Sequence, residues 1–463
     1  MPHTVGEAPV RDDLTGLFSR VALHEQLDAL LQAGAHPALI VLDLDRFKGV
    51  NDSTGITTGD GVLVRVAKRI AGAAPTHSII ARISGDEFAV IVPHGESGER
   101  VAAHLLELIG RPYAVNGFAV TLSASIGLAV APDHGTDSDA LLRSANIALH
   151  SAEGAGRQRW HRFEPWMQER ASHRQALETA LRAALGLNKL ELRNTMSVTQ
   201  FEVHYQPQVA CASGQLVGFE ALCRWRHPSF GVVGPQEFIP LAEEIGLIGL
   251  LGDWVLRTAV RAAVGWPAAP DGTLRNVAVN VSPIQLKERR ALVGSIAAAL
   301  ADSGLAPSRL EIEITESALN GDALETLQAI KALGVTLALD DFGTGYSSLS
   351  QLAQYPFDRL KIDRSFVRDL HAAPTIPQCA SSERADAHAR WMIQAIASLG
   401  TGLGLATIAE GVETEAQAEL VRQAGVTDIQ GFLISKAMPS HDVAAWIAVF
   451  DAVHTLPRIA LKE

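Results

Sequence analysis

The chain contains 463 residues, about three times the roughly 150 residues of a typical domain, so we expect two domains. Hydrophobic residues make up 47% of the sequence and charged residues 19%, which excludes disorder along the whole chain. The formal net charge of −12 excludes a protein that binds a nucleic-acid polymer through its own positive charge. A phosphate-bearing ligand would need another source of positive charge, and a metal ion is the expected one.

The cysteine content and the N-terminus indicate a cytoplasmic protein. The three cysteines form no Cys-x-x-Cys pair, which argues against disulfides and structural zinc. The first thirteen residues lack the apolar core of a signal peptide, and no apolar run is long enough to span a bilayer. Only about ten residues precede the first motif, so we expect neither a membrane segment nor a sensor domain in this chain.

Residues 10–163 predict a first domain with a central sheet flanked by helices. After an initial helix, residues 37–47 (PALIVLDLDRF) form a strand-like run that ends in acids. Residues 81–93 (ARISGDEFAVIVP) predict a β-hairpin, because two strand-like runs surround a polar turn. A helix near 96–109, a strand over 120–130 and a helix near 137–153 complete the domain.

Residues 164–199 predict a connector, with a helix over 166–186 and an irregular extension over 187–199. From about 200 to 455, strand-like runs alternate with helical patterns about eight times. This repetition predicts a closed, parallel (β/α)8 barrel of the TIM type, whose active site lies at the carboxyl ends of the strands.

Polar residues follow these predicted strands, and they suggest a site for two hard divalent cations. Carboxylates that converge at one mouth would repel one another without cations, and oxygen ligands suit Mg²⁺ or Mn²⁺. Lys361 is the basic group at a strand end and could help deprotonate a metal-bridging water. Asp363, two residues further on in the same strand, is expected on the same face, where it could support Lys361 or a metal. The candidate ligands are Glu220, Asn280, Glu313, Asp340, Asp341 and Glu410.

The second half resembles the EAL domain, which hydrolyses cyclic di-GMP to linear pGpG. The resemblance rests on FEALCRW, NVS, EITES, DDFGTGYSSL, LKIDRSF, AEGVET and QGF. It implies that the six candidate ligands hold two metals, that Lys361 is the general base and that Glu316 steadies the DDFGTG loop. It also implies substrate contacts from Gln206, Leu222, Arg224 and Gln430, and a homodimer formed through the EAL domain.

Two loops of the second half carry further expectations. The Gly-rich GTGYSS segment after Asp341 suits a mobile active-site loop. Residues 371–386, ahead of a helix expected to start near Ala387, exceed the usual family loop by about a dozen residues. A tolerated surface insertion is the favoured interpretation of that segment.

The first half resembles a GGDEF domain, the cyclase that makes cyclic di-GMP from two GTP molecules. The resemblance rests on DDLTGLFSR, DLDRFKGVND, TGD and RISGDEF. It implies metal ligands at Asp43 and Asp86, with Glu87 as the adjoining acid, and a guanine-reading pair at Asn51 and Asp60. It also implies that Lys48 and Arg157 are the basic groups on the phosphate side of the nucleotide.

Several positions depart from the GGDEF pattern. Ser84 replaces the first glycine of the signature, where an added Cβ could hinder a nucleotide. Glu153 reverses the charge of a phosphate-binding lysine, which disfavours a triphosphate. The other departures are Ile56, Asn146, His150, and Pro75 and Ser78 in place of the inhibitory Arg-x-x-Asp site.

The sequence therefore predicts a cyclic di-GMP phosphodiesterase with Mg²⁺ or Mn²⁺ and a first domain that binds GTP for regulation. An active cyclase and a purely structural dimerisation domain are the alternatives for the first half. The competing class for the whole chain is a non-catalytic cyclic di-GMP receptor. The apparently complete set of site residues favours the enzyme.

Overall fold

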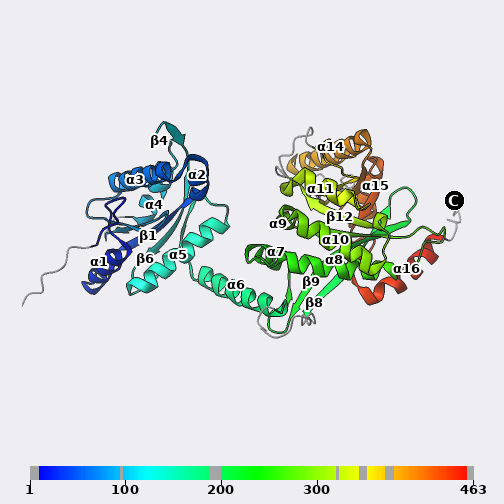
Figure 1. Ribbon diagram of the computed structural model, residues 1–463, viewed down its shortest axis with the longest axis horizontal. Coiled ribbons are helices and arrows are strands. Elements are labelled where there is room, and N and C mark those ends of the chain that lie inside the picture. The colour runs from blue at the N-terminus through cyan, green and yellow to red at the C-terminus, as the bar shows by residue number, and fades with distance from the viewer. Residues whose placement is uncertain are drawn as a thin grey trace, which may run out of the picture. The chain divides into compact units, whose positions relative to one another are not determined.

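The computed structural model describes residues 10–93, 97–186, 200–319, 323–343, 352–370 and 380–455, and it forms two compact units (Figure 1). The first unit extends to Ala176 and the second begins at Leu177. This division falls within helix α6 (Pro165–Ala184), so each unit takes part of the predicted connector helix. Three segments named above lie outside the described residues: the extension 187–199, the part of GTGYSS that follows its first residue Gly343, and residues 371–379.

The first unit has the expected layered architecture, with a five-stranded sheet in the order β2-β3-β1-β6-β7. The predicted hairpin is present, since β2 and β3 pair antiparallel around Gly85 and Asp86. A further two-stranded sheet, β4 with β5, was not predicted. The strands are β1 (Ala38–Asp45), β2 (Ile79–Ser84), β3 (Glu87–Val92), β4 (Tyr113–Val115), β5 (Phe118–Val120), β6 (Ser123–Val130) and β7 (Trp160–Arg162), and the helices are α1 (Arg20–Gln32), α2 (Phe47–Thr54), α3 (Ile56–Ala73), α4 (Gly98–Ile109) and α5 (Ser138–Gly154).

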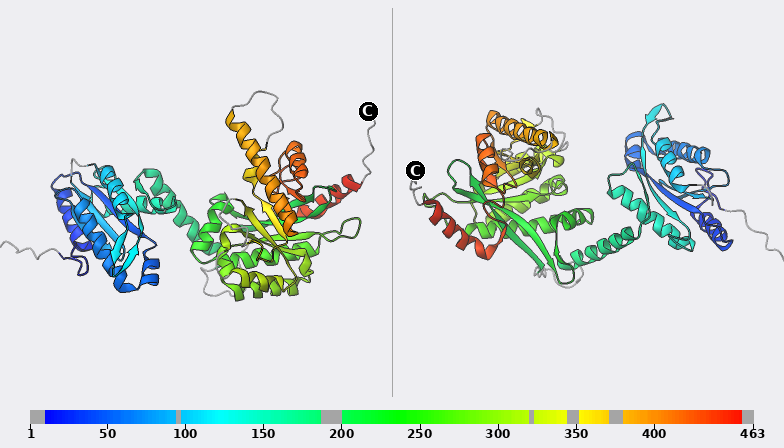
Figure 2. Two further views of the ribbon diagram at one scale, coloured as in Figure 1. Left: turned by 90° about the horizontal axis from the view of Figure 1, so that it is seen from above. Right: turned by 180° about the vertical axis from the view of Figure 1, so that it is seen from behind.

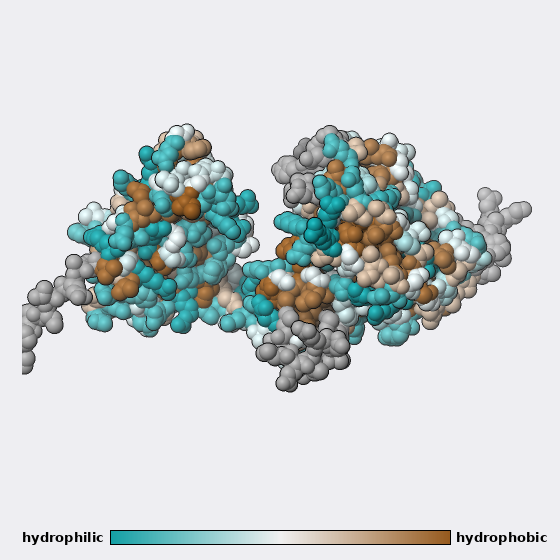
Figure 3. All heavy atoms as spheres, viewed as in Figure 1, coloured by the Kyte–Doolittle hydropathy of each residue, from teal (hydrophilic) through white to brown (hydrophobic). Residues whose placement is uncertain are grey.

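Alternation along β1 sends its side chains to two cores. Ile40 and Leu42 pack with the buried faces of α3 and α4, whereas Leu39 and Val41 pack with α1 and α5. Asp43 continues the second set, so it emerges on the same face as α5. Hydrophilic side chains dominate the viewed surface of this unit (Figure 3), as expected once both apolar faces are covered.

The second unit is a closed barrel of eight strands surrounded by helices (Figure 1). The ring runs β9-β11-β12-β13-β14-β15-β16-β8 and closes through pairing of β8 with β9, while β10 and β17 extend its margin. Its strands are β8 (Phe201–Ala210), β9 (Leu216–His227), β10 (Gly231–Val233), β11 (Asn276–Val281), β12 (Leu310–Thr315), β13 (Thr336–Phe342), β14 (Arg359–Ile362), β15 (Ala406–Ala409), β16 (Asp428–Gln430) and β17 (Met438–Pro439). Its helices are α7 (Pro235–Glu244), α8 (Ile248–Val264), α9 (Pro283–Lys287), α10 (Arg289–Ser303), α11 (Ala323–Lys331), α13 (Arg364–Arg368), α14 (Ala380–Leu403), α15 (Glu415–Gln423) and α16 (Ser440–Thr455), with 3₁₀ turns η2 (Pro307–Arg309) and η3 (Glu316–Ala318).

The prediction of a fully parallel barrel was wrong in one strand. β8 runs antiparallel to both of its neighbours, β9 and β16, and forms with β9 the long green ribbon of Figure 2. Five residues, 211–215, join β8 to β9, which is too short for the helical crossover that parallel strands require. The other seven strands of the ring are parallel to one another.

Two other differences concern the second unit. Helix α14 begins at Ala380 rather than near Ala387, so the end of the predicted insertion is helical. Asp363 does not belong to the lysine strand, because β14 ends at Ile362 and Asp363 is the N-cap of α13.

Within the described part of the chain, no helix is both long and apolar enough to cross a membrane.

Candidate functional site

Three carboxylates on strands and a fourth directly after a strand meet the ammonium of Lys361 inside the barrel mouth. The Lys361 Nζ lies 2.6 Å from Glu410, 2.9 Å from Glu313, 3.1 Å from Asp340 and 3.8 Å from Glu220. The lysine side chain is only 1% exposed, and Glu313 is fully buried. The predicted convergence at the strand ends is therefore present in the fold.

Asp340 and Asp341 reach the site together because β13 carries a bulge. On β13 the register advances from Leu339 to Phe342 while β14 advances only from Leu360 to Ile362. Asp341 has a φ of 55°, in the left-handed region where Asp is tolerated better than most residues. Without this extra residue, two adjacent side chains would point to opposite faces of the strand.

The segment around the bulge is held by two neighbouring acids. Glu316 in η3 accepts a hydrogen bond from the Gly343 backbone N–H at 3.2 Å, directly after the DDF motif. Asp363 caps α13 by accepting from the Ser365 N–H, and its charge contributes to raising the pKa of Asp341. Both residues therefore contact the Asp341 region rather than Lys361.

Glu220 is held by two amide side chains. Asn280 donates from Nδ2 to Glu220 Oε1 at 2.7 Å, and Gln430 donates from Nε2 to Glu220 Oε2 at 2.6 Å. Gln430 also donates to Gln206 Oε1 at 3.2 Å. Gln206 lies opposite Glu220 in the register of β8 and β9, so the antiparallel strand contributes to the same site.

Leu222 and Arg224 follow Glu220 at intervals of two along β9, so alternation places all three on one face. Burial lowers the pKa of Arg224, and the nearby charge of Glu220 partly offsets this effect. The guanidinium donates to the Cys223 carbonyl at 3.1 Å. Arg224 thus adds a positive charge further along the strand from Glu220.

The electrostatics of the site show a strong excess of negative charge. Burial and the neighbouring carboxylates raise the pKa of Glu313 well above its usual range, that of Glu410 to about 8 and that of Asp341 to about 6. Burial alone would lower the pKa of Lys361, but the surrounding carboxylates outweigh it and raise that pKa well above normal. In this arrangement Lys361 is a cation and not a base.

The donor set fits divalent cations by its chemistry. Among the described residues, both oxygens of Glu313 and Oε1 of Glu410 are buried without a partner in hydrogen-bond geometry. Five carboxylates and one amide are the hard ligands that Mg²⁺ or Mn²⁺ prefers. No three acidic, histidine or cysteine side chains of the described residues are already spaced as metal ligands, and the Lys361 ammonium lies 2.9 Å from Glu313.

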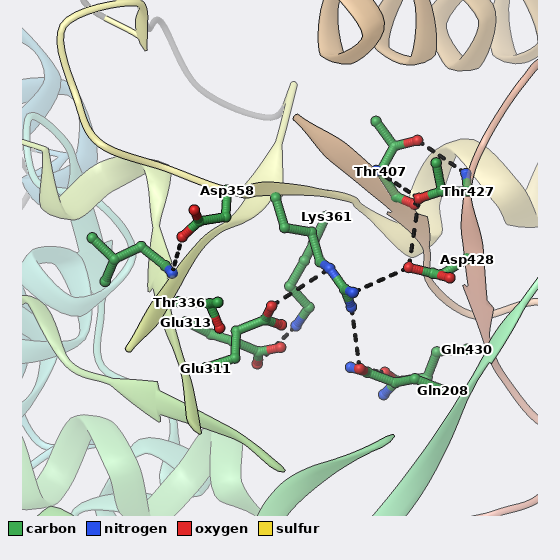
Figure 4. A network of polar contacts seen from close by, with 12 residues as sticks. Gln208, Glu311, Glu313, Thr336, Asp358, Lys361, Thr407, Thr427, Asp428 and Gln430 are labelled. Carbon is green, nitrogen blue, oxygen red and sulfur yellow. Dashed lines mark hydrogen bonds and ion pairs between the residues drawn. The ribbon is translucent and has the colours of Figure 1, made fainter. Parts of the chain in front are cut away.

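A second polar layer beneath this site was not predicted. Gln208, Glu311, Arg359 and Asp428 are all at most 8% exposed, and Arg359 contacts the other three. Figure 4 labels Gln208, Glu311 and Asp428 inside the barrel. Each of the four lies two residues along its strand from a residue of the site above: Gln208 from Gln206, Glu311 from Glu313, Arg359 from Lys361 and Asp428 from Gln430. Period-two spacing of polar residues within otherwise apolar strands was the signal that could have revealed this layer.

In the first unit, Asp43 lies among other acids on the α5 face of the sheet. Burial and the charges of Asp86, Glu153 and Glu87 raise the pKa of Asp43 to about 7. Glu153 is paired with His150, whose Nδ1 lies 2.9 Å from Glu153 Oε2. The acid that replaces the expected lysine therefore acts on Asp43.

The structure places Asn51 beside α3 and Arg157 beside Asp45. A Cβ built on Gly59 would lie 1.8 Å from Asn51 Oδ1, so Asn51 lies against the turn of α3 that carries Asp60. Lys48 is exposed on α2. Arg157 lies 3.9 Å from the buried Asp45 and lines a neighbouring cavity of about 700 Å³.

Ser84 does not distort the signature turn. It ends β2 with an exposed side chain, and its hydroxyl donates to Glu87 Oε2 at 2.7 Å. The left-handed conformation falls on the next residue, Gly85, with a φ of 41°. The substitution therefore positions the acid of the signature, and the glycine that the turn needs is retained.

Comparison with known families identifies both units. The EAL domain family model matches residues 189–437, which is more than half of the chain, and the model "Diguanylate cyclase, GGDEF domain" matches residues 10–159. The chain therefore belongs to the EAL family and carries a GGDEF domain in tandem with its EAL domain.

Two curated relatives share this organisation. The chain is 37% identical over 448 residues to "Bifunctional diguanylate cyclase/cyclic di-GMP phosphodiesterase MucR" of Pseudomonas aeruginosa, covering 95% of this chain and 62% of that protein. It is 35% identical over 442 residues to "Cyclic di-GMP phosphodiesterase PdeR" of Escherichia coli, covering 94% and 63% respectively. The chain thus spans only about three-fifths of the length of these relatives.

A solved structure supports the fold alone. The structure of "Vibrio cholerae LapD S helix-GGDEF-EAL (bound to c-di-GMP)" is similar with a TM-score of 0.54 at 17% identity, covering 92% of this chain and 96% of that one.

Proposed function

We propose that the barrel hydrolyses cyclic di-GMP to linear pGpG with two divalent cations. The observation that carries this proposal is the buried cluster of Glu220, Glu313, Asp340 and Glu410 around Lys361. Membership of the EAL family and the activities named for the two relatives support the same substrate.

The protein's own residues have separable tasks in this proposal. Glu220, Asn280, Glu313, Asp340, Asp341 and Glu410 would hold the cations. When bound, the cations would lower the pKa of a water toward neutral pH and would stabilise the leaving 3′ oxygen. Gln206, Leu222, Arg224 and Gln430 would contact the nucleotide or the attacking water.

Lys361 changes role with the charge around it. Four carboxylates keep its amine protonated in the arrangement described here. Neutralisation of those carboxylates removes the cause of the raised pKa, so that burial, which favours the neutral amine, dominates. Lys361 can then accept a proton from water, as a general base must.

The experiment is product analysis by chromatography after the chain is incubated with cyclic di-GMP and either Mg²⁺ or Mn²⁺. Wild type should form pGpG, and Glu220→Ala should form none, because it removes the carboxylate that Asn280 and Gln430 hold. Binding of cyclic di-GMP without pGpG under either metal would favour the non-catalytic receptor instead.

For the first unit we propose a GTP-binding regulatory role with little cyclase activity. The observation that supports little cyclase activity is the position of Glu153, which lies close enough to Asp43 to raise the pKa of Asp43. A triphosphate would require positive charge at this place. Asn51 and Asp60 remain available to read guanine. GTP should therefore bind and change the rate of pGpG formation, and rapid conversion of GTP to cyclic di-GMP would contradict this assignment.

A further inference from the structure

Arg359 anchors the polar layer beneath the catalytic cluster. It lies two residues before Lys361 on β14 and is 8% exposed. Its register neighbours on β13 and β15 are Ala338 and Ala406, whose small side chains leave room for the guanidinium inside the barrel. It forms ion pairs with Asp428 at 3.1 Å and Glu311 at 3.5 Å.

A chain of hydrogen bonds leads from this arginine to Glu220. Arg359 donates to Gln208 Oε1 at 3.3 Å, and Gln208 donates from Nε2 to Gln430 Oε1 at 2.9 Å. Gln430 then donates from Nε2 to Glu220 Oε2 at 2.6 Å. Figure 4 shows Gln208 and Gln430 side by side, below Asp428 in this view.

The two ends of this chain fix the orientation of both amides. A guanidinium has only donors, so the Gln208 group that faces it must be the carbonyl oxygen. A carboxylate only accepts, so the Gln430 group that faces Glu220 must be the NH₂. Only one orientation of the two glutamines satisfies all three bonds at once, and reversal of either leaves two acceptors or two donors in contact.

We propose that Arg359 and Gln208 are positioning residues that hold the Gln430 amide with its NH₂ toward Glu220. Glu220 is thereby kept in one rotamer, with Oε2 bonded to Gln430. This inference deepens the proposed function, since it assigns a support to a residue proposed to bind metal. Partners that orient a metal ligand in this way commonly change metal affinity or activity by about 10- to 100-fold when replaced.

The decisive variant is Gln208→Glu. The new carboxylate still accepts from Arg359, but it places an acceptor against Gln430 Oε1. Gln430 must then either tolerate that repulsion or turn its oxygen toward Glu220. We expect the dissociation constant for Mn²⁺, measured by calorimetry without nucleotide, to rise about tenfold and kcat for pGpG formation to fall at least tenfold.

Two further variants separate positioning from a general loss of a buried polar group. Gln208→Met removes both bonds without introducing repulsion. The Gln430 amide then loses its support while Glu220 still favours its NH₂, so Mn²⁺ affinity and kcat should both fall, but by less than in Gln208→Glu. Thr407→Val, like Gln208 only 2% exposed, removes a hydroxyl that contacts Thr427 and lies outside the relay. It should lower the melting temperature while Mn²⁺ affinity and kcat remain at the wild-type values.

The outcomes distinguish the inference from the proposed function. Wild-type behaviour of Gln208→Glu, or equal losses in all three variants, would overturn the positioning role. If wild type binds Mn²⁺ but forms no pGpG, the proposed hydrolysis fails while the Mn²⁺ affinities of the variants still decide the relay. A wild-type chain that binds no Mn²⁺ would overturn both.

Discussion

The raised pKa of Glu410 predicts that this residue destabilises the metal-free protein. Its carboxyl has a pKa of about 8 in the folded barrel and would titrate near the ordinary value of 4.5 when unfolded. At pH 7 the folded state therefore keeps a proton that the unfolded state releases. At about 1.4 kcal/mol for each pH unit between 4.5 and 7, this costs the folded state up to about 3 kcal/mol.

The sign of the pH dependence follows from the same comparison. Because the folded state binds more protons between pH 4.5 and 8, stability falls as the pH rises through this interval. The neutral isostere in Glu410→Gln carries no such cost. Its advantage over wild type should be close to zero near pH 4.5 and grow to as much as about 3 kcal/mol at pH 7.

The assay is urea unfolding in the presence of a chelator at pH 5 and pH 7. Intrinsic fluorescence suits it, because five of the seven tryptophans follow residue 200, in the barrel. The matched control is Glu413→Gln, an exposed position three residues further on, which should stay within about 0.5 kcal/mol of wild type. Unchanged or lower stability of Glu410→Gln at pH 7, or an equal gain at both pH values, would refute the reasoning. The same variant should lose pGpG formation, since it removes a proposed ligand.

Three further predictions concern the metal, the bulge and the first unit. Mn²⁺ at 100 times its dissociation constant should stabilise the barrel by about 2.7 kcal/mol in urea unfolding, and Glu220→Ala should lose most of that gain; an equal gain in both proteins would contradict the assigned site. Asp341→Gly should raise the free energy of unfolding by about 1 kcal/mol, because glycine adopts a φ of 55° without strain, and it should lower turnover. A lower free energy of unfolding would show that the Asp341 side chain stabilises the fold by more than its backbone conformation costs. Glu153→Lys should lower the Asp43 pKa and tighten GTP binding about tenfold by calorimetry, which corresponds to about 1.4 kcal/mol; unchanged affinity would remove Glu153 as the cause of weak triphosphate binding.

Much of the barrel could be predicted from the chain because its signals are local. Most of the eight strands are rich in apolar residues, and Glu220, Glu313, Asp340 and Glu410 lie in or directly after such strands. Parallel strands bring these positions to one mouth whatever the detailed register. The direction of β8 was predicted wrongly because strand-like runs look alike in either direction, and the short 211–215 connection was the local signal that was overlooked.

Local features also misled where a single residue was interpreted alone. Asp363 was assigned to the lysine strand by its period-two spacing from Lys361, yet the chain turns into α13 directly after Ile362. The outcome depended on backbone geometry one residue away. The hindrance of a nucleotide by Ser84 stays a prediction; the structure shows only that its hydroxyl donates to Glu87 and that the left-handed backbone falls on Gly85.

The sequence by itself determined the tandem of two domains, the barrel and the identity of the acids at its mouth, because motif residues and apolar periodicity are carried by the chain in order. Tertiary structure alone decided that Asp340 and Asp341 share one site, since this requires a bulge of β13 against β14. It also decided that Arg359 reaches Glu220 through Gln208 and Gln430, residues up to 222 positions apart that closure of the barrel brings into hydrogen-bond contact. Such contacts depend on strand register, and register is set by the pairing of distant segments rather than by any one of them.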